Sequence, residues 1–227
     1  MTTPFYVPPE QLVKDRADFA KKGVSRGRPI VVMVLDVGIL LIGENSSPSL
    51  RKIGEVYDRI AFAGVGRFNE FEILRVAGIR FADLKGYSYS RGDVTGKGLA
   101  NAYSQTLGQI FSHEVKPYEV DILVAELGTD IASDKLFRVQ FDGTLRDAQS
   151  FAVLGAGEES ISETLRETLR SDMSVTEAAQ LAITTITEAE GHDIDASAWE
   201  TGFLDRSMTR RTFTRLTADQ LGLTADS

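Results

Sequence analysis

Two apolar runs separated by a short turn constrain the fold of this 227-residue chain more than any other feature. Residues 30–35 (Ile-Val-Val-Met-Val-Leu) and residues 39–42 (Ile-Leu-Leu-Ile) flank Asp36, Val37 and Gly38. Apolar runs around such a turn predict an antiparallel hairpin. A strand with one solvated face alternates polar and apolar residues, whereas a strand covered on both faces does not. We therefore expect a sheet enclosed between other layers.

Groups of strands and pairs of helices follow one another along the rest of the chain. A polar loop carrying Lys52 leads to a third apolar strand over residues 59–66. Apolar periodicity then predicts helices over residues 67–85 and 99–113, strands over residues 120–125, 136–141 and 151–154, helices over residues 158–170 and 175–190, and a closing strand over residues 199–204. Asp142 and Gly143 are expected to turn the chain from the second of these strands to the third. This order predicts an α+β fold, a four-layer α-β-β-α sandwich, and not a parallel α/β sheet.

A helix is predicted ahead of the first core strand, over residues 9–22. Pro9 suits a first-turn position, and Gly23 after two lysines is typical of a helix end. Its apolar stripe consists of Leu12, Val13, Ala17, Phe19 and Ala20. An isolated helix of roughly 20 Å is marginal in water and must pack its stripe on something. Because it lies outside the predicted layers, we expect it to contact a neighbouring chain.

Composition excludes several classes of function. The formal net charge of -8 and a pI near 4.9 argue against nucleic acid or an anionic membrane surface as partner. The absence of cysteine excludes disulfides, a thiolate zinc site and cysteine catalysis. No apolar run approaches 18 residues, so we expect a cytoplasmic protein forming a single domain over residues 1–227.

Short motifs that often mark ligand sites do not predict one here. Residues 64–66 (Gly-Val-Gly) lack the third glycine and the Lys-Ser/Thr of a phosphate-binding loop. His113 and His192 are too far apart to predict a metal pair, and Asp193 with Asp195 is too isolated for a calcium loop. The sequence therefore predicts no metal site and no cofactor.

Several irregular motifs in a fixed order carry a resemblance to a known family. They include Lys-Lys-Gly23, Glu44-Asn45, Leu50-Arg-Lys-Ile53, Tyr57-Asp-Arg-Ile60, Gly66-Arg-Phe-Asn-Glu-Phe71, Asp93-Val-Thr-Gly96 and Lys116-Pro-Tyr-Glu-Val120. Over about residues 1–204 the chain resembles the α-type subunit of the actinobacterial 20S proteasome. The resemblance implies the N-terminal-nucleophile hydrolase fold with an extra N-terminal helix and no catalytic activity of its own.

The family relationship also implies an assembly and its parts. A homoheptameric ring would cap the proteolytic β subunits, dock a ring-shaped AAA ATPase and pass unfolded protein substrates. The helix over residues 9–22 would be the ring contact, residues 29–204 the core and residues 205–227 a C-terminal tail. Residues 1–8 would be the gate segment, whose gate residues are Met1, Thr2, Thr3, Pro4, Phe5, Tyr6 and Val7.

The start of the first strand agrees with a subunit that has no catalytic residue. A catalytic subunit of this fold begins that strand with a threonine whose free amine acts as base. Here Gly27, Arg28 and Pro29 precede the strand, and the nearest hydroxyl is on Ser25. An alternative from another class is an active amidase or peptidase of the same fold, self-processed at an internal nucleophile. A third is a small independent binding module.

Lys52 is the residue to which the resemblance assigns a binding role. Taken alone, a lysine in this loop predicts only a side chain that extends its ammonium group to water. The family relationship implies instead that Lys52 receives the terminal carboxylate of an activator's last residue. Arg26, in the basic segment before the first strand, would add a second contact.

Overall fold

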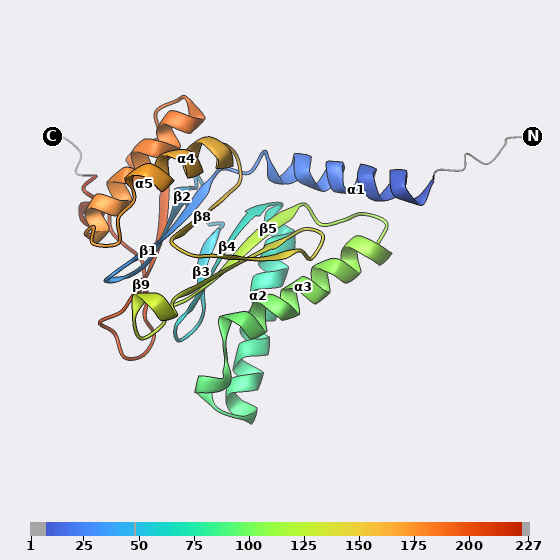
Figure 1. Cartoon of the computed structure of the whole chain (residues 1–227), viewed down its shortest axis with the longest axis horizontal. Coiled ribbons are helices and arrows are strands. Elements are labelled where there is room, and N and C mark those ends of the chain that lie inside the picture. Colours follow the sequence, from blue (N-terminus) through green and yellow to red (C-terminus); the bar gives the residue numbers. More distant parts are fainter. Residues whose placement is uncertain (1–7, 48, 224–227) are drawn as a thin grey trace, which may run out of the picture.

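A computed structural model describes residues 8–47 and 49–223, which form two stacked antiparallel sheets between two pairs of helices (Figure 1). The helices are α1 (Pro9–Val24), α2 (Phe68–Ser88), α3 (Gly96–His113), α4 (Glu158–Thr168) and α5 (Val175–Glu190). The strands are β1 (Ile30–Leu35), β2 (Gly38–Glu44), β3 (Ile53–Tyr57), β4 (Ile60–Gly66), β5 (Val120–Glu126), β6 (Lys135–Gln140), β7 (Leu145–Ala148), β8 (Phe151–Leu154), β9 (Trp199–Asp205) and β10 (Phe213–Thr214). No helix in these ranges is both long enough and apolar enough to span a membrane.

The predicted hairpin forms the centre of the first sheet. β1 and β2 pair from Ile30 opposite Gly43 to Leu35 opposite Gly38. Every residue of both strands is buried because their two faces enter different cores. Val32 lies between the two sheets, whereas its neighbour Met33 packs in the layer under α4 and α5. The continuous apolar pattern is thus explained by burial on both faces.

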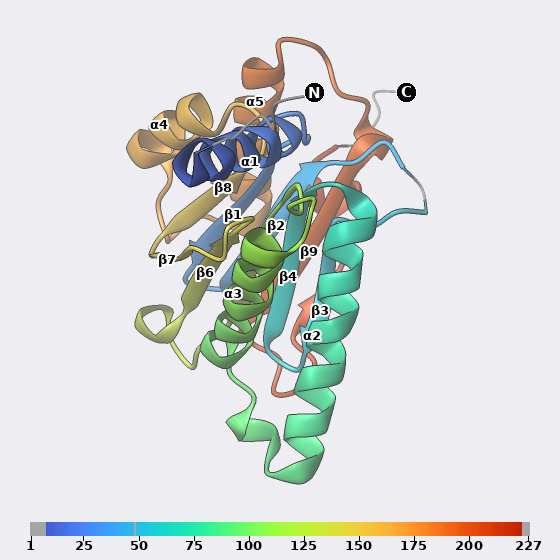
Figure 2. The same cartoon turned by 90° about the vertical axis from the view of Figure 1, so that its right-hand side faces the viewer.

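The layer order confirms the predicted α+β, four-layer α-β-β-α sandwich. One sheet has the strand order β10-β9-β2-β1-β8 and the other β3-β4-β5-β6-β7. The helices α4 and α5 cover the first sheet, and Figure 2 shows α2 and α3 lying across the outer face of the second. Three apolar cores therefore separate the four layers.

Three edge strands were missed by the sequence prediction, β3 and β7 in the second sheet and β10 in the first. β3 was assigned to the loop that carries Lys52, and Gly54 and Glu55 within it weaken the strand pattern. The turn at Asp142 and Gly143 was predicted to lead directly to residues 151–154, but it leads first into β7, which pairs with β6. β8 then crosses to the other sheet and pairs with β1.

The leading helix α1 runs two residues further than predicted, to Val24. Gly23 was expected to end the helix, but it lies inside it, where a Cβ atom would overlap the side chain of Glu119. Arg16 fastens α1 to the end of α3, since its guanidinium donates to the carbonyl of Glu114 and lies 5.5 Å from the centre of the Phe111 ring. Figure 1 shows α1 extending beyond the sandwich.

The segment after Leu204 joins the core and is not simply a tail. β10 pairs with β9 through Phe213 opposite Leu204. Leu221 is buried with the residues that pack between α5 and the first sheet. The core therefore extends past the predicted boundary at residue 204, because these apolar side chains cover the edge of the first sheet.

Candidate functional site

Lys52 lies where the loop from β2 to β3 passes the end of β2 in the first sheet. It immediately precedes β3, and its main-chain carbonyl accepts a hydrogen bond from Gly64 in β4 at 3.0 Å. Its ammonium group donates to the main-chain oxygen of Glu44, the last residue of β2, at 2.9 Å. The side chain is half-buried and is therefore held against the sandwich.

The carboxylate of Glu200 in β9 organises this loop. Glu200 is only 3% exposed, and it accepts hydrogen bonds from the main-chain N–H groups of Lys52 at 2.9 Å and Ile53 at 3.2 Å. The side chains of Asn45 (2.6 Å) and Arg215 (3.2 Å) donate to the same carboxylate. A buried charge is tolerated when it is paired and hydrogen-bonded in this way. Glu200 thus fixes the main chain on which Lys52 stands.

Charged neighbours surround the Lys52 ammonium group. Burial lowers the pKa of Lys52, and the carboxylates of Glu200 and Glu44 oppose that shift. Arg28, just before β1, lowers the pKa further by repulsion, whereas Glu190 at the end of α5 raises it. The lysine is therefore a partly desolvated cation in a site where a further carboxylate would interact strongly.

Arg28 is the arginine whose charge acts on Lys52, and the contact expected between Arg26 and an activator's carboxylate stays a prediction. Arg26 is exposed in the turn between α1 and β1. The Arg28 guanidinium forms an ion pair with Glu190, and its Nε lies 3.5 Å from a carboxylate oxygen of Glu44. The sequence contained one signal for these ion pairs. A strongly apolar strand ends in Glu44, and a charged side chain at a buried strand end needs a partner.

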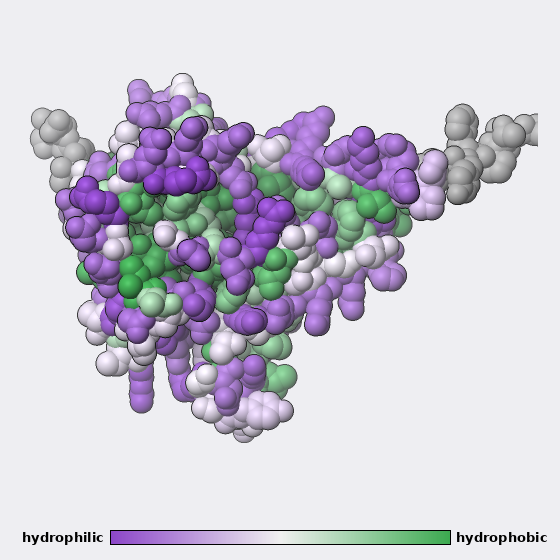
Figure 3. All heavy atoms as spheres, viewed as in Figure 1, coloured by the Kyte–Doolittle hydropathy of each residue, from purple (hydrophilic) through white to green (hydrophobic). Residues whose placement is uncertain are grey.

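The predicted apolar stripe of α1 divides into an exposed part and a buried part. Leu12 is 51% exposed and Val13 is 53% exposed, and Phe19 is also largely open to solvent. Ala20 is fully buried within the chain, and Ala17 is half-buried. Figure 3 shows apolar surface along α1 at the right of the molecule. Part of the stripe therefore anchors α1, and part remains open to another partner.

The residues ahead of β1 are built into the fold. The carbonyl of Gly27 accepts a hydrogen bond from Ala156 at 2.9 Å, and its N–H donates to Val24 at 2.8 Å. Pro29 is buried. Ser25, the hydroxyl nearest to the strand, is the residue that follows α1, and its main-chain N–H bonds to Lys21 within that helix. The N-terminal end of β1 is therefore joined to the folded helix α1 by a short turn over residues 25–29.

Two stacked antiparallel sheets between helix pairs, entered through β1, are the architecture of the N-terminal-nucleophile hydrolase class. A family model described as "Proteasome subunit" matches residues 24–201. The chain belongs to the proteasome subunit family.

The relatives it matches are α-type subunits of actinobacteria. A protein named "Proteasome subunit alpha" from Thermomonospora curvata is 48% identical over 222 residues, covering 97% of this chain and 96% of the relative. One of the same name from Kineococcus radiotolerans is 50% identical, covering 97% of each chain. A third, from Xylanimonas cellulosilytica, is 51% identical over 95% of this chain and 93% of its own.

Proposed function

We propose that this chain is a non-catalytic α subunit of the 20S core particle. Seven copies form an outer ring that gates entry to the chamber of the proteolytic β subunits. The ring docks a ring-shaped AAA ATPase, which delivers unfolded protein substrates in the cytoplasm. The observation that carries this proposal is the head of β1, where a folded helix stands in place of a free N-terminal nucleophile.

The first argument concerns catalysis. An N-terminal nucleophile needs a free amine beside its hydroxyl, which requires that nothing precede it in the chain. Here α1 precedes β1, and Arg16 holds it on α3. Cleavage near Ser25 would release α1 and break the hydrogen bond from the Gly27 N–H to Val24. These contacts favour a subunit that shapes a passage over one that hydrolyses peptide bonds.

The second argument concerns docking at Lys52. Its ammonium group bonds only to a neutral carbonyl of Glu44 among the contacts described, so an incoming carboxylate would exchange a neutral acceptor for a charged one. The ammonium group already strengthens its bond to that carbonyl, and a carboxylate acceptor would add Coulombic attraction to it. The Glu200 network keeps the lysine in place before the ligand arrives, which lowers the entropy lost on binding.

The test compares Lys52→Ala with the wild-type chain in particles assembled with β subunits. A peptide with the C-terminal sequence of the ATPase should bind the wild-type particle, and the same peptide with an amidated terminus should not. Loss of one partner of a desolvated charge pair typically weakens binding by about 2 to 5 kcal/mol. Lys52→Ala should abolish ATPase-driven protein degradation and leave small-peptide hydrolysis intact.

The control is Lys97→Ala, which removes an exposed lysine from α3 on the other side of the sandwich. It should bind the peptide as the wild type does. Undiminished coupling in Lys52→Ala would reject the docking role. An intact mass below that of the encoded chain, together with hydrolysis by the isolated subunit, would instead favour the self-processed amidase.

A further inference from the structure

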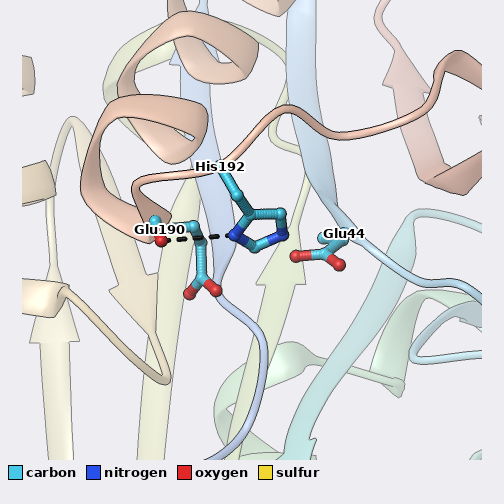
Figure 4. A group of neighbouring side chains, drawn as sticks. All are labelled: Glu44, Glu190 and His192. Atoms are coloured by element: carbon cyan, nitrogen blue, oxygen red, sulfur yellow. Dashed lines mark hydrogen bonds between the residues drawn. The ribbon is translucent and has the colours of Figure 1, made fainter.

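Three side chains from two distant parts of the sequence meet beside β2. Glu44 stands at the end of β2, Glu190 at the end of α5 and His192 in the loop that follows. One ligand atom of each lies within 4.8 Å of the others (Figure 4). Sequence spacing predicted no metal pair for His192, because its partner Glu44 is brought to it only by the fold.

The ring of His192 is oriented as a ligand. Its Nδ1 lies 3.2 Å from the main-chain oxygen of Glu190. A carbonyl oxygen only accepts, so Nδ1 carries the proton and Nε2 of the neutral ring keeps a free lone pair. Figure 4 shows the other ring nitrogen directed toward the Glu44 carboxylate. Histidines that bind metals commonly donate their second N–H to a carbonyl in this manner.

Glu44 supplies an independent indication of a missing ligand. The residue is only 6% exposed, and its Oε2 is buried without a hydrogen-bond partner among the described residues. Buried carboxylate oxygens are normally paired, because leaving one without a partner forfeits its hydration. A cation between Glu44, Glu190 and His192 would satisfy this oxygen.

We propose that Glu44, Glu190 and His192 bind a divalent cation of the zinc class. One imidazole nitrogen with two carboxylate oxygens suits Zn²⁺ better than Mg²⁺ or Ca²⁺, which prefer oxygen ligands alone. Zinc bonds of about 2.0 to 2.2 Å place tetrahedral ligands about 3.4 Å apart, so the group must contract around the ion. Exposed His192 can move, because Gly191 (φ 69°) connects it to α5. Water would complete the coordination.

Arg28 is the competitor of the proposed ion. Its guanidinium pairs with Glu190 and lies 3.5 Å from Glu44, so it now balances both carboxylates. Nearly half of the Arg28 side chain is exposed, which allows it to leave when an ion enters. Lys52 also acts on this group, since Glu44 and Glu190 both raise its pKa against the effect of burial. Removing Arg28 should therefore favour the metal. This inference does not depend on the proposed docking function.

The experiment is a titration of the untagged full-length chain with Zn²⁺, followed by calorimetry. A parallel titration with Co²⁺ reports coordination geometry through its visible absorption. We expect one ion per chain, and His192→Asn should weaken binding by roughly tenfold or more. Glu44→Gln should act in the same direction. Because Glu44 is buried, its substitution can also destabilise the fold, so the result for the exposed His192 decides the test.

The chain offers a matched control. His113 is the only other histidine, it is exposed on α3, and its Nδ1 also lies near a main-chain oxygen, that of Gln109, at 3.1 Å. His113→Asn should bind Zn²⁺ as the wild type does, whereas Arg28→Gln should bind it several-fold more tightly. Absence of saturable binding would overturn the proposal, and so would equal binding by His192→Asn or weaker binding by Arg28→Gln.

Discussion

Glu200 holds the main chain from which the Lys52 side chain extends. Removing Glu200 should therefore destabilise this site even when no ligand is present. Glu200→Ala leaves the main-chain N–H groups of Lys52 and Ile53 without their acceptor and removes the carboxylate that pairs with Arg215. Leaving a buried donor without a hydrogen-bond partner typically costs about 1 to 3 kcal/mol, whereas Arg215, with 39% of its side chain exposed, can be hydrated. Urea unfolding of the isolated chain should detect this loss. Glu188→Ala, at an exposed site on α5, should stay within about 0.5 kcal/mol of the wild type.

The lowered pKa of Lys52 predicts a dependence of stability on pH. Because burial disfavours its charged form, the folded chain is destabilised by this charge at pH 7, where both folded and unfolded states are protonated. The penalty falls as pH rises through the lowered folded pKa and is gone above the unfolded value of about 10.4. Lys52→Met should therefore be more stable than the wild type at pH 7.

Unfolding measured across this alkaline range provides the check. The difference in unfolding free energy between Lys52→Met and the wild type should shrink as pH rises. Titration of other groups cancels in the comparison, since both chains share them. A difference that stays constant across the range would mean that Lys52 is not desolvated.

At the scale of elements, the packing of α1 on the sandwich and its proposed ring contact can be separated by substitution. Leu12 and Val13 face solvent, so replacing both by Ser should leave the thermal midpoint of the isolated chain nearly unchanged. The same variant should reduce ring formation if these side chains contact a neighbouring subunit. Native mass spectrometry, with and without a β subunit, measures the assemblies formed. Rings that assemble as in the wild type would remove the ring contact from this part of α1.

Ala20 provides the opposite case on the same helix. It is fully buried within the chain, so Ala20→Leu forces extra volume into a packed contact and should destabilise the fold by about 1 to 3 kcal/mol. Thermal or urea unfolding of the isolated chain checks this. A neutral result would show that α1 is loosely placed on the sandwich.

The elements found from sequence and those missed differ in their burial. β1, β2 and β5 are buried on both faces. Their sequences are therefore apolar runs, which can be recognised without knowing the fold. β3 and β7 lie at the two edges of the second sheet, where β3 combines buried with partly buried residues and β7 has no fully buried residue. β3 and β7 are strands because they pair with β4 and β6, and a local sequence pattern does not record that pairing.

At the scale of the whole molecule, the gate is the part of the proposal to test by deletion. The gate residues Met1 to Val7 lie outside the described residues. If their segments close the axial pore, removing residues 1–7 from the assembled particle should raise the rate of small-peptide hydrolysis several-fold. Peptide hydrolysis assays on matched particles measure it. Unchanged rates would remove the gate assignment, while docking at Lys52 would be unaffected.

The sequence alone determined the layered architecture, because a strand that is buried on both faces has an unbroken run of apolar residues. It also determined the absence of a nucleophile at the head of β1, which depends only on the order of residues. The tertiary structure decided the surroundings of Lys52. Glu200, Glu190 and Arg28 are distant along the chain, and only the packing of β9, α5 and β1 brings their charges within range of one another. Electrostatic interactions depend on distance in space, which no local pattern records.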